Sequence, residues 1–463
     1  MADRTNKQVV VIGGGITGLA ATFYLQKEAR EKGLPYDVKL VESTHRVGGK
    51  VQTVKRDGYV IEKGPDSVFT TNDSILKLAG ELGISNTLVT NEKGKSFVIA
   101  GGELYPIPGG SIVGIPTQIA PFVTTNLFSL TGKMRAAADF LLPRSQMTED
   151  QSLGTFFRRR MGDEVVDHLI EPLLTGIFAG DIDQMSLMST FPQFYELEQK
   201  HRSLIAGIKK NSQKETSEGG FLTFTGGLQS MIDALEAKIE PGTVYKSMKA
   251  THIRKEDKGY SVTFANGSIE CDAIILAAPH HVVQRLLPQE EYMEFLKEMP
   301  ATSVATVAMG FDNDAIKQKR DGTEFLVSRN SDFSLTAAAW THRKWPHTAP
   351  KGKALIRSYL GKPGDEAIVD LSDDQIEQIV IEDLNKIVEL KAKPEFTIVS
   401  RYKQSMPQYT VGHRDRIREM ARKAEESIPG IFITGSSFEG LSIPDCVVQG
   451  EAAVEKTLQF LQD

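Results

Sequence analysis

The sequence predicts an α/β fold whose central part is a Rossmann-like nucleotide-binding domain assembled from separated segments of the chain. Two observations predict this fold. A strand, a glycine turn and a helix open the chain, and a strand, a glycine-rich turn and a helix close it. The stretch between them lacks this pattern. We therefore expect an α+β substrate domain beside the nucleotide-binding domain, and a helical domain inserted into the chain.

The first element is one strand–helix–strand unit. An apolar strand at Gln8–Ile12 leads into the glycine turn Gly13–Gly15, the helix Ile16–Lys32 and a second strand at Asp37–Glu42. This order is typical of the start of a dinucleotide-binding fold.

The middle of the chain, roughly Asn91–Glu215, is mostly helical by its hydrophobic spacing. It contains an uncharged stretch, Leu104–Gly132, that is long enough to raise the question of a membrane span. Four prolines would break a spanning helix, so we expect loops and short helices instead. They would line an apolar pocket, touch a membrane surface or form ordinary core, and the sequence does not decide among these. Asn211–Gly220 has the composition of a linker.

Strand patterns return in the last part of the chain. The expected strands are Tyr260–Phe264, Asp272–Ala278, Ser303–Phe311, Lys353–Gly361 and Ile431–Thr434, with helices at Asp373–Leu390 and from about Asp445. From this order we expect a discontinuous nucleotide-binding domain at 1–75, 220–295 and 400–463. The substrate domain would comprise 76–90 and 296–399, and the helical domain 91–219.

Composition excludes several classes of protein. The 463 residues carry a formal net charge of -6, which makes nucleic acid an unlikely partner. The two cysteines, Cys271 and Cys446, lie far apart in sequence and form no Cys/His cluster. We therefore expect no disulfide framework and no metal site, and a reducing compartment fits. Met1–Gln8 is polar, and the apolar run after it is too short for the core of a signal peptide.

The glycine turn predicts phosphate binding. It contains the pattern Gly13-x-Gly15-x-x-Gly18, in which the intervening residues are Gly14, Ile16 and Thr17. Glycines let the backbone approach a pyrophosphate, and the helix N-terminus supplies N–H groups with a partial positive charge. Glu42, 24 residues after Gly18, suits the hydroxyls of a ribose and disfavours a 2′-phosphate. The three features together predict a dinucleotide site.

The residues after Glu42 indicate which dinucleotide binds. They read STHRVGGK, with Arg46, Gly48 and Gly49 directly after the acid. This extension resembles the flavin amine oxidase superfamily, in which the loop continues over the cofactor, whereas nicotinamide dehydrogenases lack it. The resemblance implies FAD. The closing segment agrees, because its helix begins near Ile443-Pro444-Asp445, and in this superfamily that helix start points at the flavin. Asp445 would also cap the helix.

Segments in the middle of the chain narrow the resemblance to the bacterial porphyrinogen oxidases. They are EPLLTGIFAGD (171–181), GPDS (64–67), SMPQY (405–409) and GLSIPD (440–445), and the likeness runs from Lys7 to Leu461. It implies oxidation of coproporphyrinogen III, and less specifically of protoporphyrinogen IX, in haem biosynthesis. Hydride would pass to non-covalently bound FAD and then to O2, giving H2O2. The implied partners are a tetrapyrrole and oxygen, and the implied location is cytoplasmic, with peripheral membrane contact left open.

Single residues carry over from the family pattern as expectations. Gly176 matches a glycine whose carbonyl faces the pyrrole N–H groups, so no side-chain base is expected. Ala250 falls where relatives usually have a valine that contacts adenine through its backbone, and Tyr402 falls where they often have an aromatic residue near the flavin. The expected FAD contacts are Gly13, Gly14, Gly15, Ile16, Thr17, Gly18, Glu42, Ser43, Lys50, Gly64, Pro65, Asp66, Ser67, Ala250, Tyr402, Ile443, Pro444 and Asp445.

One departure concerns the substrate carboxylates. Plant and mitochondrial members usually carry an arginine in the loop that here reads Gly109–Ile112, and this chain has none. Arg158–Arg160 and Lys209–Lys210 are the alternative cations, but we expect solvated helix faces there.

Three other functions stay open from the sequence. An amine oxidase would usually place a lysine on the strand Ala301–Phe311, which has none. A carotenoid desaturase-like oxidase, or a flavin- or porphyrin-binding protein without turnover, would also fit the flavin pattern.

Overall fold

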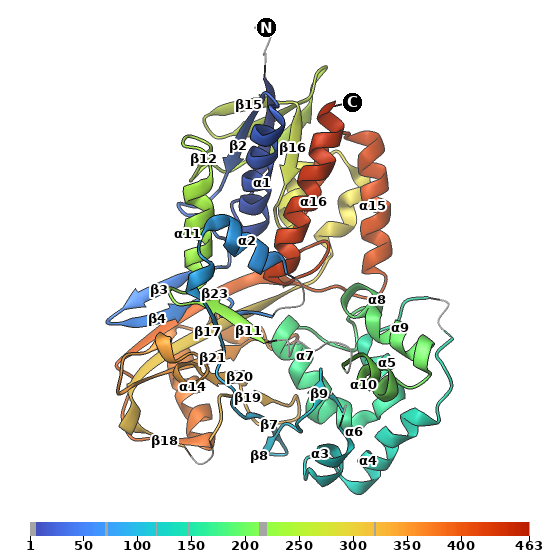
Figure 1. Cartoon of the computed structure of the whole chain (residues 1–463), viewed down its shortest axis with the longest axis vertical. Helices are drawn as coiled ribbons and strands as arrows, with labels where there is room; N and C mark the ends of the chain where they lie inside the picture. The colour runs from blue at the N-terminus through green and yellow to red at the C-terminus, as the bar shows by residue number, and fades with distance from the viewer. Residues whose placement is uncertain are drawn as a thin grey trace.

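The computed structural model describes residues 6–69, 73–116, 118–146, 149–212, 220–318 and 321–462. They form an upper region with a parallel sheet between layers, a lower region built on a large sheet, and a helical region beside it (Figure 1). The first strand and the last helix both lie in the upper region (Figure 1). This architecture confirms the predicted fold class. Residues 213–219, within the expected linker, lie outside the described residues.

The upper region is centred on five parallel strands. Their order is β12 (Val244–Tyr245), β2 (Tyr36–Val41), β1 (Lys7–Ile12), β16 (Ala273–Leu276) and β24 (Ile431–Ile433). Alternate residues of β1 face opposite sides, so Val9 and Val11 belong to one core and Val10 and Ile12 to the other. Both faces are therefore covered, as expected for a parallel sheet.

Each face has its own cover. Helices α1 (Ile16–Lys32), α2 (Ser74–Leu82), α11 (Gln229–Lys238) and α16 (Ile443–Gln462) pack on one side. The other side carries the antiparallel strands β13 (His252–Lys255), β14 (Tyr260–Phe264) and β15 (Gly267–Cys271), with α12 (His280–Leu286) and α15 (His413–Ser427). A Cβ on Gly450 of α16 would lie 2.8 Å from the Thr17 carbonyl, so a glycine is needed for α1 and α16 to pack this closely.

The lower region is a seven-stranded mixed sheet. Its order is β23 (Phe396–Pro407), β17 (Ala301–Asp312), β21 (Lys353–Leu360), β20 (Leu335–Trp340), β19 (Glu324–Val327), β7 (Ser96–Ala100) and β8 (Glu103–Pro106). Helix α14 (Asp373–Ile387) packs against one face of this sheet. Strands β7 and β8 fall within 91–219, so the sheet joins segments that the sequence analysis assigned to different domains.

Short strands connect the upper and lower regions. A hairpin of β3 (Thr53–Arg56) and β4 (Tyr59–Glu62) is followed by a small sheet of β5 (Val68–Phe69), β11 (Phe221–Phe224) and β6 (Leu88–Thr90). The segment 63–67 between β4 and β5, which we call the strap, lies against the large sheet.

The helical region is made of short elements around one core. They are α3 (Ile119–Thr124), α4 (Leu130–Ala137), α5 (Leu153–Met161), α6 (Asp163–Val165), η3 (Val166–Ile170), α7 (Glu171–Phe178), α8 (Leu187–Thr190), α9 (Pro192–His201) and α10 (Leu204–Ser212). Segment η3 is a π-helix that leads directly into α7. Pro172 explains the widening, because a proline has no N–H for the carbonyl four residues earlier.

The arginine run is not a solvated helix face, so that expectation was wrong for Arg160. Its side chain is fully buried and donates to Asp139 Oδ1 at 2.6 Å and Glu198 Oε1 at 3.2 Å. Arg159 pairs with the same Glu198, and Arg158 pairs with Asp167 at 2.7 Å. These partners hold helices of this region together, so the run does not offer free cations to a substrate.

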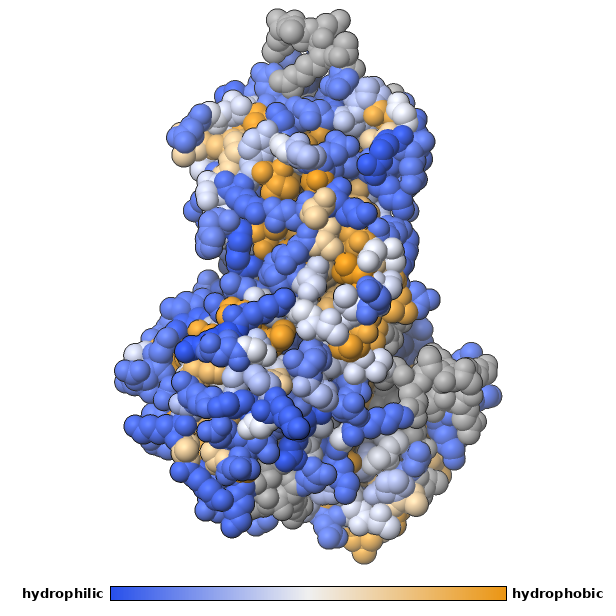
Figure 2. Space-filling view, turned by 60° about the vertical axis from the view of Figure 1, so that its left-hand side comes forward, coloured by the Kyte–Doolittle hydropathy of each residue, from blue (hydrophilic) through white to orange (hydrophobic). Residues whose placement is uncertain are grey.

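In its described residues the uncharged stretch forms turns and short helices, as predicted, and also the short strands β8, β9 (Ser111–Ile112) and β10 (Ile115–Pro116), which were not predicted. Among the described helices, none combines the length and apolar character that crossing a membrane requires. Several large apolar side chains in and after this stretch are exposed: Val123, Leu130, Met134, Phe140 and Leu141. On the face shown in Figure 2, hydrophobic residues gather in the middle and hydrophilic ones cover much of the rest.

Candidate functional site

The glycine turn has the geometry of a phosphate-binding loop. Gly13 has a φ of +110°, and a Cβ there would lie 2.2 Å from the Ala277 carbonyl. A Cβ on Gly18 would lie 1.9 Å from the Gly13 carbonyl, whereas one on Gly15 would meet nothing within 4 Å. Gly15 is the N-cap of α1, and among the residues that the structure describes no side chain caps this helix. The first turn of α1 therefore leaves its amides free for an anion.

Glu42 lies under the same turn and is nearly buried. Its Oε2 accepts a hydrogen bond from the Gly14 amide at 2.8 Å, and its Oε1 accepts from the Thr44 amide at 2.7 Å and from Ser43 Oγ at 3.1 Å. A carboxylate has about four acceptor positions, so one on Oε2 is left for a ribose hydroxyl. Glu42 thus braces the turn, in addition to its expected role as a ribose ligand.

The segment after Glu42 closes over the turn. The Gly48 amide donates to the Gly14 carbonyl at 2.7 Å, and Gly49 lies against Gly15. Arg46 donates to the carbonyls of Val47, Val51 and Gly49. Its role here is to hold the loop, because the guanidinium satisfies three backbone carbonyls.

Ala250 borders the ribose side of this loop. Just before it, the Ser247 amide donates to the Thr44 carbonyl, and the Met248 amide donates to the Glu42 carbonyl at 2.8 Å. The Ala250 side chain is buried in the core between the parallel sheet and β13–β15. The backbone contact of Ala250 to adenine stays a prediction.

Lys50 supplies the positive charge that a diphosphate would require. It follows Gly49, and burial lowers the pKa of its ammonium. Within the described residues no carboxylate forms an ion pair with it. The Cys446 thiol, near the start of α16, acts in the opposite direction and raises the pKa of Lys50. A partly buried ammonium without an anionic partner, next to an uncapped helix start, fits a bound anion.

The strap 63–67 is held by the large sheet. Thr306 Oγ1 of β17 donates to the Lys63 carbonyl at 2.5 Å, and Arg357 Nη2 of β21 donates to the Gly64 carbonyl at 2.5 Å. A Cβ on Gly64 would lie 1.9 Å from the Lys50 carbonyl and 3.1 Å from Tyr402 Oη. The strap therefore brings the predicted flavin contacts Lys50, Gly64 and Tyr402 together.

Arg357 is fully buried and centres a charged network beneath the strap. It donates to Tyr359 Oη at 3.0 Å and lies 3.4 Å from Asp66 Oδ2. Burial alone would raise the pKa of Asp66, but Lys344 and Arg357 hold it below its usual range. Lys344 pairs in turn with Glu324 at 2.9 Å. The strap residues Pro65, Asp66 and Ser67 thus lie over two buried cations, Arg357 of the sheet and Lys344 of the short helix α13 (Thr341–Lys344).

The start of α16 is fixed by reciprocal bonds. The Asp445 amide donates to Ser442 Oγ at 3.2 Å, and the Ser442 amide donates to Asp445 Oδ2 at 3.1 Å. This is a capping box, so the expected capping role of Asp445 is confirmed. Gln449, one turn later, accepts from the Gly435 amide and donates to the Gly440 carbonyl, which holds both ends of the glycine-rich turn.

Two buried histidines hold the middle of that turn. His280 shares hydrogen bonds with Ser437 Oγ through its amide and its Nδ1, both at 3.1 Å, and His413 Nε2 donates to the Phe438 carbonyl at 3.0 Å. Burial lowers the pKa of each imidazole to about 4. Both are therefore neutral near pH 7 and act as structural supports.

Gly176 lies on the other side of the site, near the end of α7. It is exposed, Ile177 beside it is 58% exposed, and a Cβ on Gly176 would lie 3.3 Å from Leu326 of β19. Because α7 ends at Phe178, no donor within the described residues reaches the carbonyls of Gly176 and Ile177. Unpaired carbonyls at a helix C-terminus carry a partial negative charge. They can accept hydrogen bonds from a ligand.

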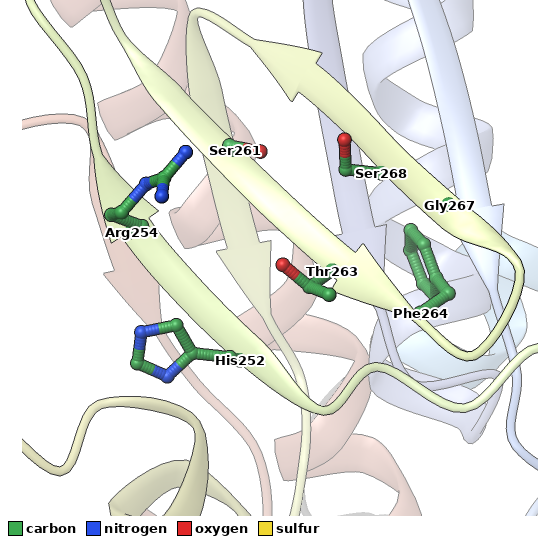
Figure 3. Close-up of a pocket in the computed structure, with 7 residues that line it drawn as sticks. All are labelled: His252, Arg254, Ser261, Thr263, Phe264, Gly267 and Ser268. Atoms are coloured by element: carbon green, nitrogen blue, oxygen red, sulfur yellow. The ribbon is translucent and has the colours of Figure 1, made fainter.

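One open hollow lies elsewhere. It measures about 290 Å³ and is lined by His252, Arg254, Ser261, Thr263, Phe264, Gly267 and Ser268 of β13–β15 (Figure 3). Arg254, its cation, is already paired with Glu256 at 2.7 Å. We assign this hollow no part in the site, because the glycine turn, strap and α7 are built from other elements.

Several residues of the site were not found from the sequence. Arg357 could have been suspected, because it is a lone charge within the buried strand ALIRSYL. Gln449, His280 and His413 gave no comparable signal, since each acts through hydrogen bonds to the glycine-rich turn that no local sequence pattern marks.

Comparisons with known proteins agree with this geometry. The family model for flavin containing amine oxidoreductase matches residues 16–458. A coproporphyrinogen III oxidase of Bacillus subtilis is 52% identical, with 98% of each chain covered. One of Staphylococcus aureus is 42% identical over 98% of this chain and 100% of its own.

A solved structure matches over the same length. The crystal structure of a candidate protoporphyrinogen oxidase from Exiguobacterium has a TM-score of 0.89 at 36% identity, covering 99% of this chain and 100% of its own. The resemblance drawn from the sequence is confirmed, and with it a flavin cofactor. The chain belongs to the flavin-containing amine oxidoreductase family.

Proposed function

We propose that this protein oxidises coproporphyrinogen III to coproporphyrin III with molecular oxygen, as a step of haem biosynthesis, and accepts protoporphyrinogen IX less specifically. The observation that carries the proposal is the full-length similarity to two coproporphyrinogen III oxidases, at 52% and 42% identity. The aligned length covers the glycine turn and α7 alike. The cofactor side and the substrate side of the proposal therefore rest on the same relatives.

We assign FAD as the cofactor. In support, Glu42 offers an acceptor to a ribose, while the uncapped start of α1 and the unpaired Lys50 offer positive groups to a diphosphate. Bound FAD would supply the redox chemistry, taking a hydride from a meso CH2 bridge and passing the electrons to oxygen, which leaves as H2O2. The strap and the start of α16 would orient its ring system.

We also propose that FAD is held without a covalent bond. Cys446 lies at the start of α16, but burial raises the pKa of its thiol, so little reactive thiolate is present. Precipitating the protein with acid should release all of the flavin into the supernatant. Flavin that remains on the precipitated chain would contradict this assignment.

On the substrate side, α7 would act through its backbone. Loss of a hydride leaves positive charge on the tetrapyrrole, and the C-terminal end of a helix favours positive charge nearby. The Gly176 carbonyl would accept a hydrogen bond from the pyrrole N–H groups, which lose the accompanying protons. No side-chain base is needed in this scheme. Replacing each of the nine histidines singly, at saturating FAD, should leave turnover within roughly tenfold.

The preference for coproporphyrinogen III rests on the loop Gly109–Ile112. It has no arginine, and we expect the conformationally permissive pair Gly109-Gly110 to allow a wider, more hydrated mouth that suits four propionates. The test is an aerobic assay of both porphyrinogens side by side, followed by porphyrin fluorescence and compared as kcat/KM. A clear preference for protoporphyrinogen IX would overturn the substrate assignment alone. Inactivity on both, with oxidation of a polyamine or a carotenoid precursor, would overturn the proposed function.

We further propose that the protein touches membrane surfaces peripherally. The support is the exposed apolar set of the helical region, in which Leu130 is 73% exposed and Val123 55%. Co-sedimentation with phosphatidylglycerol vesicles should fall when Leu130 and Met134 are both replaced by serine. Equal sedimentation of the wild type and the double serine variant would contradict this proposal.

A further inference from the structure

A single arginine of the large sheet grips both ends of the helix that carries Gly176. Arg329 follows β19, and its Nε lies 3.2 Å from Glu171 Oε1 at the start of α7. Its Nη2 donates to Asp181 Oδ1 at 2.9 Å, just beyond the end of α7, and its Nη1 lies 3.8 Å from Asp183. Three carboxylates of the helical region thus share one guanidinium of the sheet region.

The carboxylate at the start of α7 is built into the helix. Glu171 is buried, and its Oε1 also accepts from Thr175 Oγ1 at 3.1 Å. The same hydroxyl lies 3.3 Å from the Gly180 carbonyl, in the turn that follows the helix. A displacement of Glu171 would therefore be passed to the turn that ends α7.

The last carbonyl of α7 has a second tie to the sheet. Gln408, directly after β23, donates through Nε2 to the Phe178 carbonyl at 3.1 Å. The carbonyls of Gly176 and Ile177 lie between these two ties. No donor from the described part of the chain reaches them, while the backbone on both sides of them is bound to the large sheet.

We propose that Arg329 is a positioning residue, whose ion pairs with Glu171 and Asp181 hold α7 against the large sheet and so set where the Gly176 carbonyl meets the tetrapyrrole. This inference rests on the proposed function, because it assigns the carbonyl a substrate. The guanidinium itself is occupied by three acids, so Arg329 is a clamp between regions and does not bind a substrate carboxylate.

The clamp has a pH dependence that follows from its surroundings. Burial raises the pKa of Glu171, while Arg329, Thr175 and Lys362 lower it and Asp167 raises it. Protonation of Glu171 removes its ion pair with Arg329, so the wild-type kcat should fall on the acid side. A variant without the guanidinium has no such pair to lose, and its kcat should lack this acid limb.

The experiment compares R329Q, E171Q, the double variant R329Q/E171Q and the conservative R329K in FAD-saturated enzyme with coproporphyrinogen III. R158Q is the matched control, because Arg158 also contacts Asp183 but joins only elements of the helical region. We expect R329Q to lower kcat about tenfold with KM within about twofold, R329K to recover most of it, and the double variant to equal R329Q. Hydrogen exchange over 171–181 should rise in R329Q, whereas kcat should be unchanged in R158Q.

The outcomes separate the clamp from the proposed function. Unchanged exchange over 171–181 in R329Q would overturn the clamp, whatever the enzyme oxidises. Faster exchange with unchanged kcat, equal loss in R158Q, or additive losses in the double variant would overturn the positioning role. A wild-type enzyme that oxidises no porphyrinogen would refute the proposed function, and the exchange measurement would still decide whether Arg329 holds α7.

Discussion

The phosphate end and the tetrapyrrole end of the site are built in different ways. At the phosphate end, the glycine turn bonds to Glu42, and Arg46 bonds to the loop that follows, so these bonds all lie within residues 14–51. At the tetrapyrrole end, α7 depends on Arg329, 148 residues from Asp181, and on Gln408, 230 residues from Phe178. The first end is a local motif that can be recognised along the chain. The second exists only once distant segments have packed.

The largest effect should come from breaking the local motif. In G18A the new Cβ would lie 1.9 Å from the Gly13 carbonyl, and backbone atoms cannot yield as a side chain does. We expect purified G18A to contain no measurable flavin. The control is G80A in α2, where the nearest atom to the new Cβ is Ser85 Oγ at 3.8 Å. Normal flavin content in G18A would show that the turn does not need this glycine.

Removing the buried cation of the sheet should have the next largest effect. R357M leaves Asp66 and the Gly64 carbonyl without their buried partner, which costs about 3–5 kcal/mol of unfolding free energy. Urea unfolding measures it. The control R343M removes an exposed pair with Asp321 and should cost below about 1 kcal/mol. Equal losses in the two variants would show that burial of Arg357 does not matter.

The same contrast between local and distant contacts decides what could be predicted from the sequence. Gly13 and Gly18 were predicted because their role follows from spacing within one turn, and α1 was predicted at its observed bounds, Ile16–Lys32. Arg160 was assigned wrongly, because its partners Asp139 and Glu198 are invisible in its own helical pattern. The pairing of β7 with β19 could not be predicted either, because no local sequence pattern indicates that two distant segments will form parallel neighbours.

The third effect in size should be a loss of unfolding free energy in acid, caused by the two buried histidines of the glycine-rich turn. Burial lowers the pKa of His280 and His413 to about 4 in the folded chain, against an ordinary value of 6.5. The unfolded chain therefore binds these protons first, and stability that is complete above pH 6.5 is lost as the pH falls toward 4. The loss is on the order of 3 kcal/mol for each imidazole.

The measurement is urea unfolding at pH 7 and pH 5, with H413Q as the comparison. Removing the imidazole should flatten the pH dependence between these values. An identical pH dependence in H413Q would show that the buried imidazole of His413 does not contribute to the loss of stability in acid.

Glu42 should give the smallest of these effects. E42A removes a hydrogen bond to a charged group, worth about 1.5–3 kcal/mol of FAD affinity, with little change of fold. E42Q keeps the volume and one carbonyl acceptor, so its FAD affinity should lie between those of E42A and the wild type. Titration of the apoprotein with FAD measures both. Wild-type affinity in E42A would exclude Glu42 as the ribose ligand.

Both ends are needed for the central claim, that a flavin site and a backbone acceptor on α7 together oxidise porphyrinogens. The most direct measurement mixes the purified enzyme anaerobically with coproporphyrinogen III and follows flavin absorbance, then admits oxygen and follows porphyrin fluorescence. We expect bleaching of the flavin without oxygen, and then three molecules of H2O2 formed for each porphyrin. Flavin that stays oxidised in the presence of coproporphyrinogen III would contradict it.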